Sequence, residues 1–537
     1  MAIHRKLISM LGPLALCGVC GLLAALPFRD VDSSLSAWVV FAPVFWVVAR
    51  AKSKKAAAFY AYVFALVWTS RSFTFMWANA FEGAIAAALY TAFVYMLALL
   101  CVRRLARAGG TAAVFGVAAA WVLAEIVRSV IPILYFPWLL LGHTLWVNAP
   151  LRQGADVLGV YGLSFLIAVF NAWLAFALPA AVSSFFRRNG AGAPFYGRDE
   201  SLKHAWRSLS ILLALIGGFF FYGYERIARI APRLKPGATI AVIQGNVKTK
   251  LGRTVEMLNE QTIRHLELHR QVVAEITAHE GKPPALVCWA ETMVPGSMYE
   301  DEWGEQFQKE IAKVGVPTLA GSNFLEPDDR DKAEDEKRTH NAAFIFDAKG
   351  KEILRYCKRR LVPFGEYVPY GRVSRIMGWI RSVTQDRYVP GTECSEVIDI
   401  GGYHIALNIC VEDTHPAIAR EDAFHGADTL VNITNDGWFY GTYGPRSHLQ
   451  AAMWRAIETR RPLLRVTNTG RTVAVDPLGN IELILPPETE AAGLAKLMRI
   501  DGGGAQIVTP YMRLGEFWTA VIFGLVLCVS VWLSPKQ

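Results

Sequence analysis

Three ionisable side chains, each placed directly after a hydrophobic run, are the residues of this chain best suited to chemistry on a carbonyl group. They are Glu291, Lys358 and Cys410. A thiol that attacks an ester or amide needs a base for its proton, stabilisation of the oxyanion and an acid for the leaving group. Glu291 suits the proton transfers, Lys358 the charge stabilisation and Cys410 the attack. The pattern predicts acyl chemistry at a Glu, Lys, Cys constellation.

Neighbouring groups are candidates for supporting roles. The backbone N–H of Val411 is the natural second donor to an oxyanion, and Glu366 or Glu412 can hold the lysine and orient the site. Burial after a strand would raise the pKa of Glu291 toward that of a useful base and acid. His415 keeps a Cys–His dyad open as a weaker alternative.

Each of the three residues also has a structural alternative. A lone cysteine at a strand end is usually a packing residue, a lysine beside two arginines is usually solvated, and a glutamate after a strand often caps a helix. All three terminate predicted strands, and this shared position favours the catalytic interpretation over three coincidences.

The segments that must position these residues begin near Thr239. Short β-type runs alternate there with polar helical stretches, and two turns, 347–350 and 476–479, are typical of hairpins. Helical periodicity covers 253–279 and 448–459. The mixture predicts an α/β or α+β layered domain of about 270 residues. The predicted strands are 239–244, 285–289, 317–321, 342–346, 353–356, 404–409, 429–433, 463–466 and 472–475.

The composition predicts a membrane protein. Hydrophobic residues make up 53% of the 537 residues and charged residues only 19%, which is too apolar for an ordinary soluble protein. A helix crosses a bilayer with about 17–25 apolar residues, and we count eight candidate spans. The charge-free stretches are 7–27, 33–49, 56–70, 83–102, 108–124, 157–186, 208–224 and 517–535.

The cations predict the orientation of these spans. They gather before the first span and after the second, fourth and sixth, which places the N-terminus in the cytoplasm. Segment 129–151 is long and charge-free, but its prolines favour a re-entrant or interfacial, non-spanning segment. The predicted domains are therefore a bundle of seven spans in 1–225, an extracytoplasmic catalytic domain in 226–513, and a last span with its tail in 514–537.

Charge and cysteine patterns exclude other classes of function. The net charge is +9, but the cations cluster beside the spans, where they anchor the chain to anionic lipid heads, so nucleic-acid binding is not expected. The eight cysteines have neither paired spacing nor accompanying histidine clusters. Neither a disulfide framework nor a metal site is predicted.

Several motifs together give a resemblance to a known family. The chain resembles the nitrilase, or carbon–nitrogen hydrolase, superfamily, and looks more specifically like its apolipoprotein N-acyltransferase branch from Gram-negative inner membranes. The resemblance extends over almost the whole chain, and the runs at 358–369 and 461–470 are its most specific parts. The motifs lie at 136–142, 160–165, 242–246, 289–291, 358–369, 410–412, 432–439 and 461–470.

The resemblance implies an α-β-β-α sandwich carried by the membrane bundle and a role for each site residue. Cys410 would be the nucleophile, Glu291 the general base and Lys358 the charge stabiliser, with Glu366 and Glu412 as further glutamates around the site. A phospholipid, phosphatidylethanolamine by expectation, would donate an acyl chain to the thiol, and the α-amine of a diacylglyceryl apolipoprotein would accept it. The enzyme would need no cofactor or metal and would act as a monomer with its catalytic domain in the periplasm.

The chain departs from the family pattern at two positions. Val411 stands where members commonly have a tyrosine, which puts an aromatic contribution in doubt but keeps the backbone N–H. Arg253 lies near the place where many members have a tryptophan. The positioning of the donor lipid is therefore expected to differ from that of other members.

Two apolar segments are candidates for contact with lipid. Residues 372–387 combine Ile376, Met377 and Trp379 with four arginines, a mixture suited to an interfacial lid, although an ordinary amphipathic surface segment is the alternative. Trp438 and its two aromatic neighbours either form another apolar rim or pack in the core.

Two other functions compete with acyl transfer between lipids. A membrane-anchored amidase or nitrilase would use water as acceptor and would not depend on lipid, but eight spans are excessive for an anchor. A transporter with a soluble domain would carry ionisable residues within its spans. The predicted spans are almost free of them, with Glu82 and Glu125 at their margins.

Overall fold

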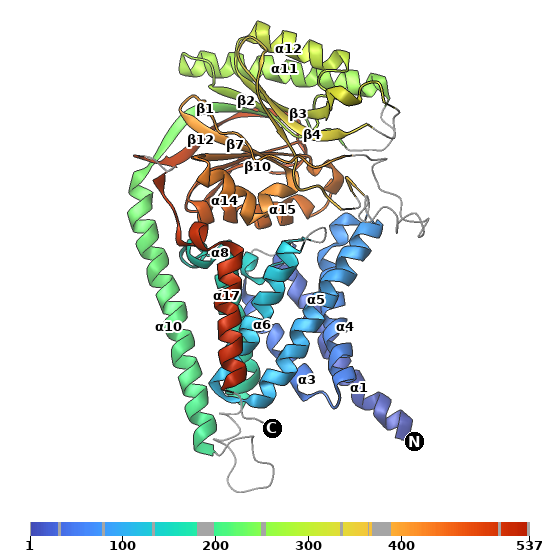
Figure 1. The fold of residues 1–537 in the computed structure, drawn as a ribbon, viewed down its shortest axis with the longest axis vertical. Helices are drawn as coiled ribbons and strands as arrows, with labels where there is room; N and C mark the ends of the chain where they lie inside the picture. Colours follow the sequence, from blue (N-terminus) through green and yellow to red (C-terminus); the bar gives the residue numbers. More distant parts are fainter. Residues whose placement is uncertain are drawn as a thin grey trace. The chain divides into compact units, whose positions relative to one another are not determined.

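The computed structural model describes residues 2–29, 34–77, 81–131, 135–179, 198–248, 254–332, 337–363, 365–367, 388–502 and 506–533. It divides into two compact units (Figure 1). One unit comprises residues 1–77, 84–227 and 514–537, and the other comprises 78–83 and 228–513. The boundaries predicted after residues 225 and 513 remain a proposal for where the chain leaves the membrane.

The first unit is helical, and most of the described residues of the eight predicted spans lie on its helices. Within the described residues, six helical segments are long and apolar enough to cross a membrane: 10–28, 81–106, 110–130, 155–177, 202–233 and 510–532. The main helices are α1 (Ala2–Ala25), α2 (Leu35–Val39), α3 (Phe41–Arg50), α4 (Lys54–Ser72), α5 (Phe81–Ala108), α6 (Gly110–Val130), α8 (Ala155–Ala172), α10 (Arg198–Ile230) and α17 (Pro510–Trp532).

The count of eight spans therefore exceeds the six helices that meet the length and hydropathy criterion. The predicted span 33–49 falls on α2 and α3, and the apolar helical stretch there, Leu35–Arg50, is shorter than 18 residues. The predicted span 56–70 falls on α4, which has 19 residues. Lysines at its start and Arg71 near its end lower its mean hydropathy. Both segments are helical, but neither is a span by its own length and composition.

Segment 129–151 does not continue as a long helix, because two charged residues of α6 bind its backbone. Glu125 and Arg128 are fully buried. The Glu125 carboxylate accepts the N–H of Leu141 at 2.8 Å, and the Arg128 guanidinium donates to the carbonyl of Phe136 at 2.6 Å. Irregular backbone at membrane depth is tolerated where protein groups satisfy it. Glu125 thus lies inside the bundle rather than at a span margin, and it satisfies backbone groups there.

In the described residues of the second unit, the strands form two six-stranded sheets. The first has the order β12-β1-β2-β3-β4-β5, and the second has the order β11-β10-β9-β8-β7-β6. The strands of the first sheet are β1 (Leu234–Gln244), β2 (Leu286–Trp289), β3 (Thr318–Leu325), β4 (Thr339–Phe346), β5 (Glu352–Cys357) and β12 (Ala491–Ile500). Those of the second are β6 (Ile398–Ile400), β7 (Tyr403–Ile409), β8 (Thr429–Thr434), β9 (Leu463–Thr467), β10 (Thr472–Val475) and β11 (Ile481–Leu485).

Helices cover the outer face of each sheet, as Figure 1 shows. The helices α11 (Val255–Glu280) and α12 (Glu302–Val314) lie over the first sheet. The helices α14 (Pro416–Phe424) and α15 (Gly444–Ala452) lie over the second sheet, and α16 (Trp454–Thr459) packs against α14. The expected α-β-β-α sandwich is confirmed.

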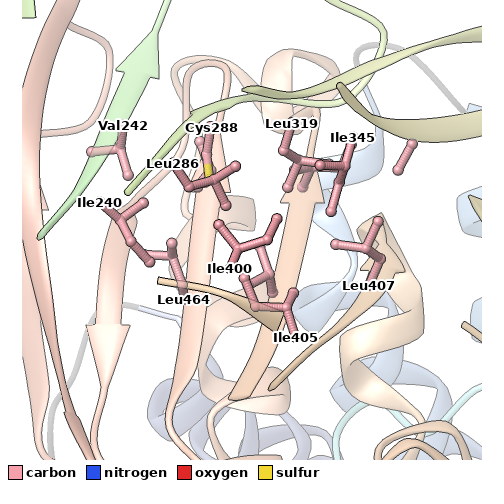
Figure 2. Packing of buried hydrophobic residues seen from close by; sticks show 14 of the residues in the cluster. Ile240, Val242, Leu286, Cys288, Leu319, Ile345, Ile400, Ile405, Leu407 and Leu464 are labelled. Carbon is pink, nitrogen blue, oxygen red and sulfur yellow. The ribbon is translucent and has the colours of Figure 1, made fainter. Parts of the chain in front are cut away.

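The core of this unit lies between the two sheets. Figure 2 shows side chains of the first sheet, such as Ile240 and Leu319, facing side chains of the second, such as Leu407 and Leu464. All four are at most 1% exposed. Full burial of such a side chain contributes about 1.5–3 kcal/mol, so this layer stabilises the frame that holds the strand ends.

Strand directions bring the ends of distant strands together. The neighbours β1, β2 and β3 are parallel, as are β7, β8 and β9. Because β3–β4 and β4–β5 are antiparallel pairs, β5 runs in the same direction as β2. The carboxyl ends of β2 and β5 therefore lie at one edge of the first sheet. Glu291 follows the first of these strands and Lys358 the second.

Candidate active site

Glu291 lies just beyond β2 and is held from three sides. Its Oε1 accepts a hydrogen bond from Asn341 Nδ2 at 2.7 Å and lies 3.3 Å from Lys358 Nζ. Its Oε2 accepts the backbone N–H of Asn435 at 2.7 Å. The following residue, Thr292, has a φ of 54°, in the left-handed region that a β-branched residue rarely adopts. The carboxylate is buried and its orientation is set by donors from three separate strand ends.

Lys358 follows β5 and forms ion pairs with two carboxylates. Its Nζ lies 2.8 Å from Glu366 Oε1 and 3.3 Å from Glu291 Oε1, and the residue is 1% exposed. Burial lowers the pKa of Lys358, but the charges of Glu291 and Glu366 outweigh it and raise the pKa well above its ordinary value. The lysine is therefore a permanent ammonium at neutral pH.

Glu366 is the glutamate that holds this lysine. Its Oε1 also accepts Asn341 Nδ2 at 2.9 Å, and its Oε2 accepts the backbone N–H of Val362 at 2.8 Å. Asn341 thus bridges Glu291 and Glu366 through one amide nitrogen. Of the two glutamates predicted to hold the lysine, Glu366 forms the ion pair in this structure.

Glu412 instead accepts hydrogen bonds from backbone N–H groups next to Lys358 and next to Cys410. Its Oε1 accepts the N–H groups of Arg359 at 2.8 Å and Arg360 at 3.0 Å, and its Oε2 accepts that of Ile409 at 2.9 Å. The Tyr356 hydroxyl donates to the same carboxylate. Glu412 therefore joins the residues after Lys358 to the residue before Cys410.

Cys410 occupies a strained position at the end of β7. It begins the 3₁₀ helix η7 (Cys410–Thr414) with a φ of 53°. A residue other than glycine held in this region costs about 1–3 kcal/mol and is common at functional sites. The side-chain amide of Asn432 donates to the Cys410 carbonyl at 3.0 Å and helps to hold the turn.

The Cys410 thiol is electrostatically coupled to the other two residues. Burial raises the pKa of the thiol, the charge of Glu291 raises it further, and the ammonium of Lys358 opposes both. The resting group is therefore a thiol that needs a base when it attacks. Val411 is in the first turn of η7, where backbone N–H groups have no acceptor within the helix. The role of this N–H as an oxyanion donor stays a prediction.

The remaining predicted site residues are placed differently. Residues 372–387 with Ile376, Met377 and Trp379, and also Arg253, lie outside the described residues. Trp438 belongs to the 3₁₀ helix η8 (Asp436–Phe439) and is partly buried, between the predicted rim and core positions. Burial, together with the charges of Arg360 and Arg455, lowers the pKa of His415 to about 3. Such a histidine is a poor base at neutral pH, which disfavours a Cys–His dyad.

Sequence reasoning missed several residues that complete the arrangement. The sequence pattern singles out neither Asn341 nor Tyr356, and it includes Asn435 only within the motif 432–439. Gly321 on β3 was also missed, although a side chain there would lie 2.7 Å from the Glu291 Cα. Within the described chain, no cluster of three or more His, Cys, Asp or Glu side chains fits a metal ion.

This arrangement, a buried Glu–Lys pair beside a strand-end cysteine on an α-β-β-α sandwich, defines a carbon–nitrogen hydrolase-type domain. The carbon–nitrogen hydrolase family model matches residues 239–499, and the model of the apolipoprotein N-acyltransferase N-terminal domain matches residues 20–173. The chain belongs to the apolipoprotein N-acyltransferase family.

Curated relatives support this assignment over most of the chain. An apolipoprotein N-acyltransferase of Nitrosomonas europaea is 31% identical over 76% of this chain and 73% of its own length. That of Geobacter metallireducens is 29% identical over 88% of this chain and 86% of its own. The Methylococcus capsulatus protein is 29% identical over 95% and 93%. The similarity therefore includes both the membrane helices and the catalytic domain.

Proposed function

We propose that this protein transfers an acyl chain from a phospholipid to the α-amine of a diacylglyceryl apolipoprotein through a thioester on Cys410. Phosphatidylethanolamine is the proposed donor, and the protein is proposed to act as a monomer in the bacterial inner membrane. The observation that carries the proposal is the buried Glu291–Lys358–Glu366 arrangement whose charges act on the Cys410 thiol. It occurs in a chain that also has the membrane helices of its family.

In the first half-reaction, Cys410 Sγ attacks the ester carbonyl of the phospholipid as its proton moves to Glu291. Within the described chain, Glu291 Oε2 accepts one hydrogen bond, from Asn435 N, so a lone pair remains for this proton. The ammonium of Lys358 and the N–H of Val411 stabilise the oxyanion. When the C–O bond breaks, Glu291 returns the proton to the alcohol oxygen of the departing lysophospholipid.

In the second half-reaction, the acceptor's α-amine attacks the thioester carbonyl. The same two donors stabilise the second oxyanion, and Glu291 takes a proton from the attacking nitrogen. The C–S bond then breaks, an amide forms and the proton returns to the sulfur of Cys410. Neither half-reaction consumes a nucleotide or oxidant, because an ester is exchanged for a thioester and then for an amide.

The transfer assay that tests this proposal combines the purified protein, acyl-labelled phosphatidylethanolamine and a synthetic S-diacylglyceryl-cysteinyl peptide. We expect the label to appear on the peptide as a hydroxylamine-resistant amide, with equimolar lysophospholipid. The matched acceptor with an acetylated α-amine should receive no label. Release of the label as free fatty acid at the same rate with either peptide would instead indicate a hydrolase.

We propose further that the catalytic domain lies in the periplasm, which is supported by the cations beside alternate spans. Two exposed lysines offer a test of orientation. Lys349 lies in the turn between β4 and β5, and Lys52 lies between α3 and α4. In spheroplasts, a membrane-impermeant maleimide should label Lys349→Cys above the wild-type background, and Lys52→Cys only after permeabilisation. The reverse pattern would place the catalytic domain in the cytoplasm.

A further inference from the structure

Beneath the Cys410 turn lies a cluster of four charged or titratable side chains that the reaction steps do not use. They are Asp413, Asp436, His448 and Arg465, each at most 1% exposed. They come from four different elements: η7, η8, α15 and β9. These residues are called the buried charge cluster.

The contacts of the cluster form a closed ring. His448 places Nε2 3.0 Å from Asp413 Oδ1 and Nδ1 3.0 Å from Asp436 Oδ1. Arg465 binds the second oxygen of each carboxylate, with Nε 2.9 Å from Asp413 Oδ2 and Nη1 3.1 Å from Asp436 Oδ2. Both aspartates are therefore held by the same two partners.

Charge balance indicates that His448 carries a proton on both ring nitrogens. Two carboxylates and one guanidinium would leave a buried net charge of −1, and an imidazolium brings the sum to zero. One contact opposes this, since Arg465 Nη2 lies 2.6 Å from His448 Nδ1. Burial and Arg465 lower the pKa of His448, but Asp413 and Asp436 outweigh them and raise it. Each ring nitrogen faces a carboxylate oxygen, which an imidazolium satisfies and a neutral ring does not.

The cluster joins the two turns that carry site groups. Asp413 belongs to the same 3₁₀ helix as Cys410 and lies three residues after it. Asp436 directly follows Asn435, whose backbone N–H holds Glu291 Oε2 at 2.7 Å. The His448 bridge therefore sets, in part, the distance between the turn that carries Cys410 and the turn that carries Asn435.

We infer that His448 is a positioning residue, which as an imidazolium locks the Cys410 turn to the Asn435 turn so that the thiol and the Glu291 carboxylate meet in reacting geometry. This role rests on the proposed function, but it concerns the alignment of two protein groups and not the identity of the lipid. The contacts of His448 within the buried charge cluster involve none of the three residues of the proposed triad. Misplacement of reacting groups by about 1 Å can cost about 100-fold in rate.

The proposal implies a pH dependence of stability with a defined sign. Because the pKa of His448 is raised in the folded protein, the stabilisation from its proton is fully present below the unfolded value. It is lost as the pH rises through the folded value. Among the described residues, titratable or charged groups that face the ring include Asp413, Asp436 and Arg465. Because an amide does not titrate, this pH-dependent loss of stability should disappear in His448→Gln.

The test compares His448→Gln with the double variant His448→Gln/Asp413→Asn in the full-length protein. The single variant leaves a net charge of −1 in the cluster, whereas the double variant restores zero. We expect the single variant to acylate Cys410 at least about 10-fold more slowly at saturating phosphatidylethanolamine, with a smaller change in KM. The double variant should recover most of this loss. A double variant that is no faster than His448→Gln, or a folded His448→Gln protein with the wild-type rate, would overturn the proposal.

A second readout separates this proposal from the proposed function. Alkylation of Cys410 by iodoacetamide needs no lipid, and its rate and pH profile report the environment of the thiol. We expect both to change in His448→Gln and to return toward wild type in the double variant, even if no phospholipid acylates the wild-type protein. Unchanged alkylation would contradict the positioning role.

The matched control is His404→Gln. His404 also lies beside two aspartates, 3.2 Å from Asp428 and 3.7 Å from Asp399, but its side chain is 52% exposed. It lies on β7 before Cys410, and within the described chain no hydrogen bond or ion pair joins it to the proposed triad or to the buried charge cluster. Neither the acylation rate nor the alkylation profile should change in this variant.

Discussion

Cys410→Ala is expected to abolish acyl transfer, with a loss on the order of 10,000-fold or more, while the protein still folds and inserts. Without the thiol no thioester can form, so the variant loses the whole covalent pathway. The loss is therefore larger than that from removal of one stabilising contact. Alanine should fold, because the strain at this position resides in the backbone, where the φ of Cys410 is 53°. The measurement is the initial rate of label transfer to the diacylglyceryl peptide, with the thermal unfolding midpoint as a check of folding.

Cys394→Ala is the matched control for this variant. Cys394 is also a partly buried free thiol of the catalytic domain. It follows no strand and has no ion pair beside it among the described residues, so its removal should leave transfer unchanged. Substantial transfer by Cys410→Ala would require a different nucleophile, or a direct attack of the amine on the phospholipid.

Glu291→Gln is expected to slow acylation of Cys410 by about 100- to 10,000-fold, the range typical of the loss of a general base. The amide has nearly the same shape, but it cannot take the thiol proton. Among the described residues, the carboxylate has three partners, and each of them is a donor: Asn341 Nδ2, Lys358 Nζ and Asn435 N. The new NH2 group would therefore face a donor, and we also expect a lower unfolding midpoint. Single-turnover acylation by phosphatidylethanolamine measures the first effect.

The control variant is Glu310→Gln, which removes a buried carboxylate that the proposed reaction does not use. It distinguishes the loss of the general base from the loss of stability that follows the removal of a buried carboxylate. Glu310 is 7% exposed and pairs with Arg270 at 2.5 Å on the outer helices α11 and α12. Its substitution should lower stability and leave the acylation rate unchanged. A Glu291→Gln protein that is folded and acylates as fast as the Glu310→Gln protein would exclude Glu291 as the base.

The strand ends that carry the proposed triad are predictable from sequence, because each is a short apolar run followed by one ionisable group. The structure places Glu291 after β2, Lys358 after β5 and Cys410 at the end of β7. Both predicted hairpin turns are also present, with Gly350 and Gly479 in the left-handed region. The catalytic roles of these residues stay predictions until they are tested.

The sequence pattern does not predict three of the strands, β6, β11 and β12. The reason is the composition of β12 and the short length of the other two. Residues 491–500 of β12 contain three alanines and two leucines, together with single lysine, methionine and arginine residues, all of which favour a helix in isolation. They form a strand because they pair with β1 along nearly its whole length, so tertiary pairing overrides local propensity. The strands β6 and β11 have only three and five residues and lie at the two edges of one sheet.

Contacts among distant residues are the part of the site that sequence patterns cannot show. Asp413, Asp436, His448 and Arg465 meet only because β7, β8 and β9 lie side by side beneath α15. Glu125 illustrates the same limit in the membrane unit. From sequence it belongs to the margin of a span, but the fold buries it against the backbone of Leu141.

The most direct test of the account is the intact mass of the protein after incubation with phosphatidylethanolamine alone, followed by peptide mapping. We expect one added acyl chain on the peptide that contains Cys410. Hydroxylamine should remove this chain, and the diacylglyceryl peptide should discharge it. An unmodified protein, or an acyl chain on another residue that the acceptor does not discharge, would contradict it.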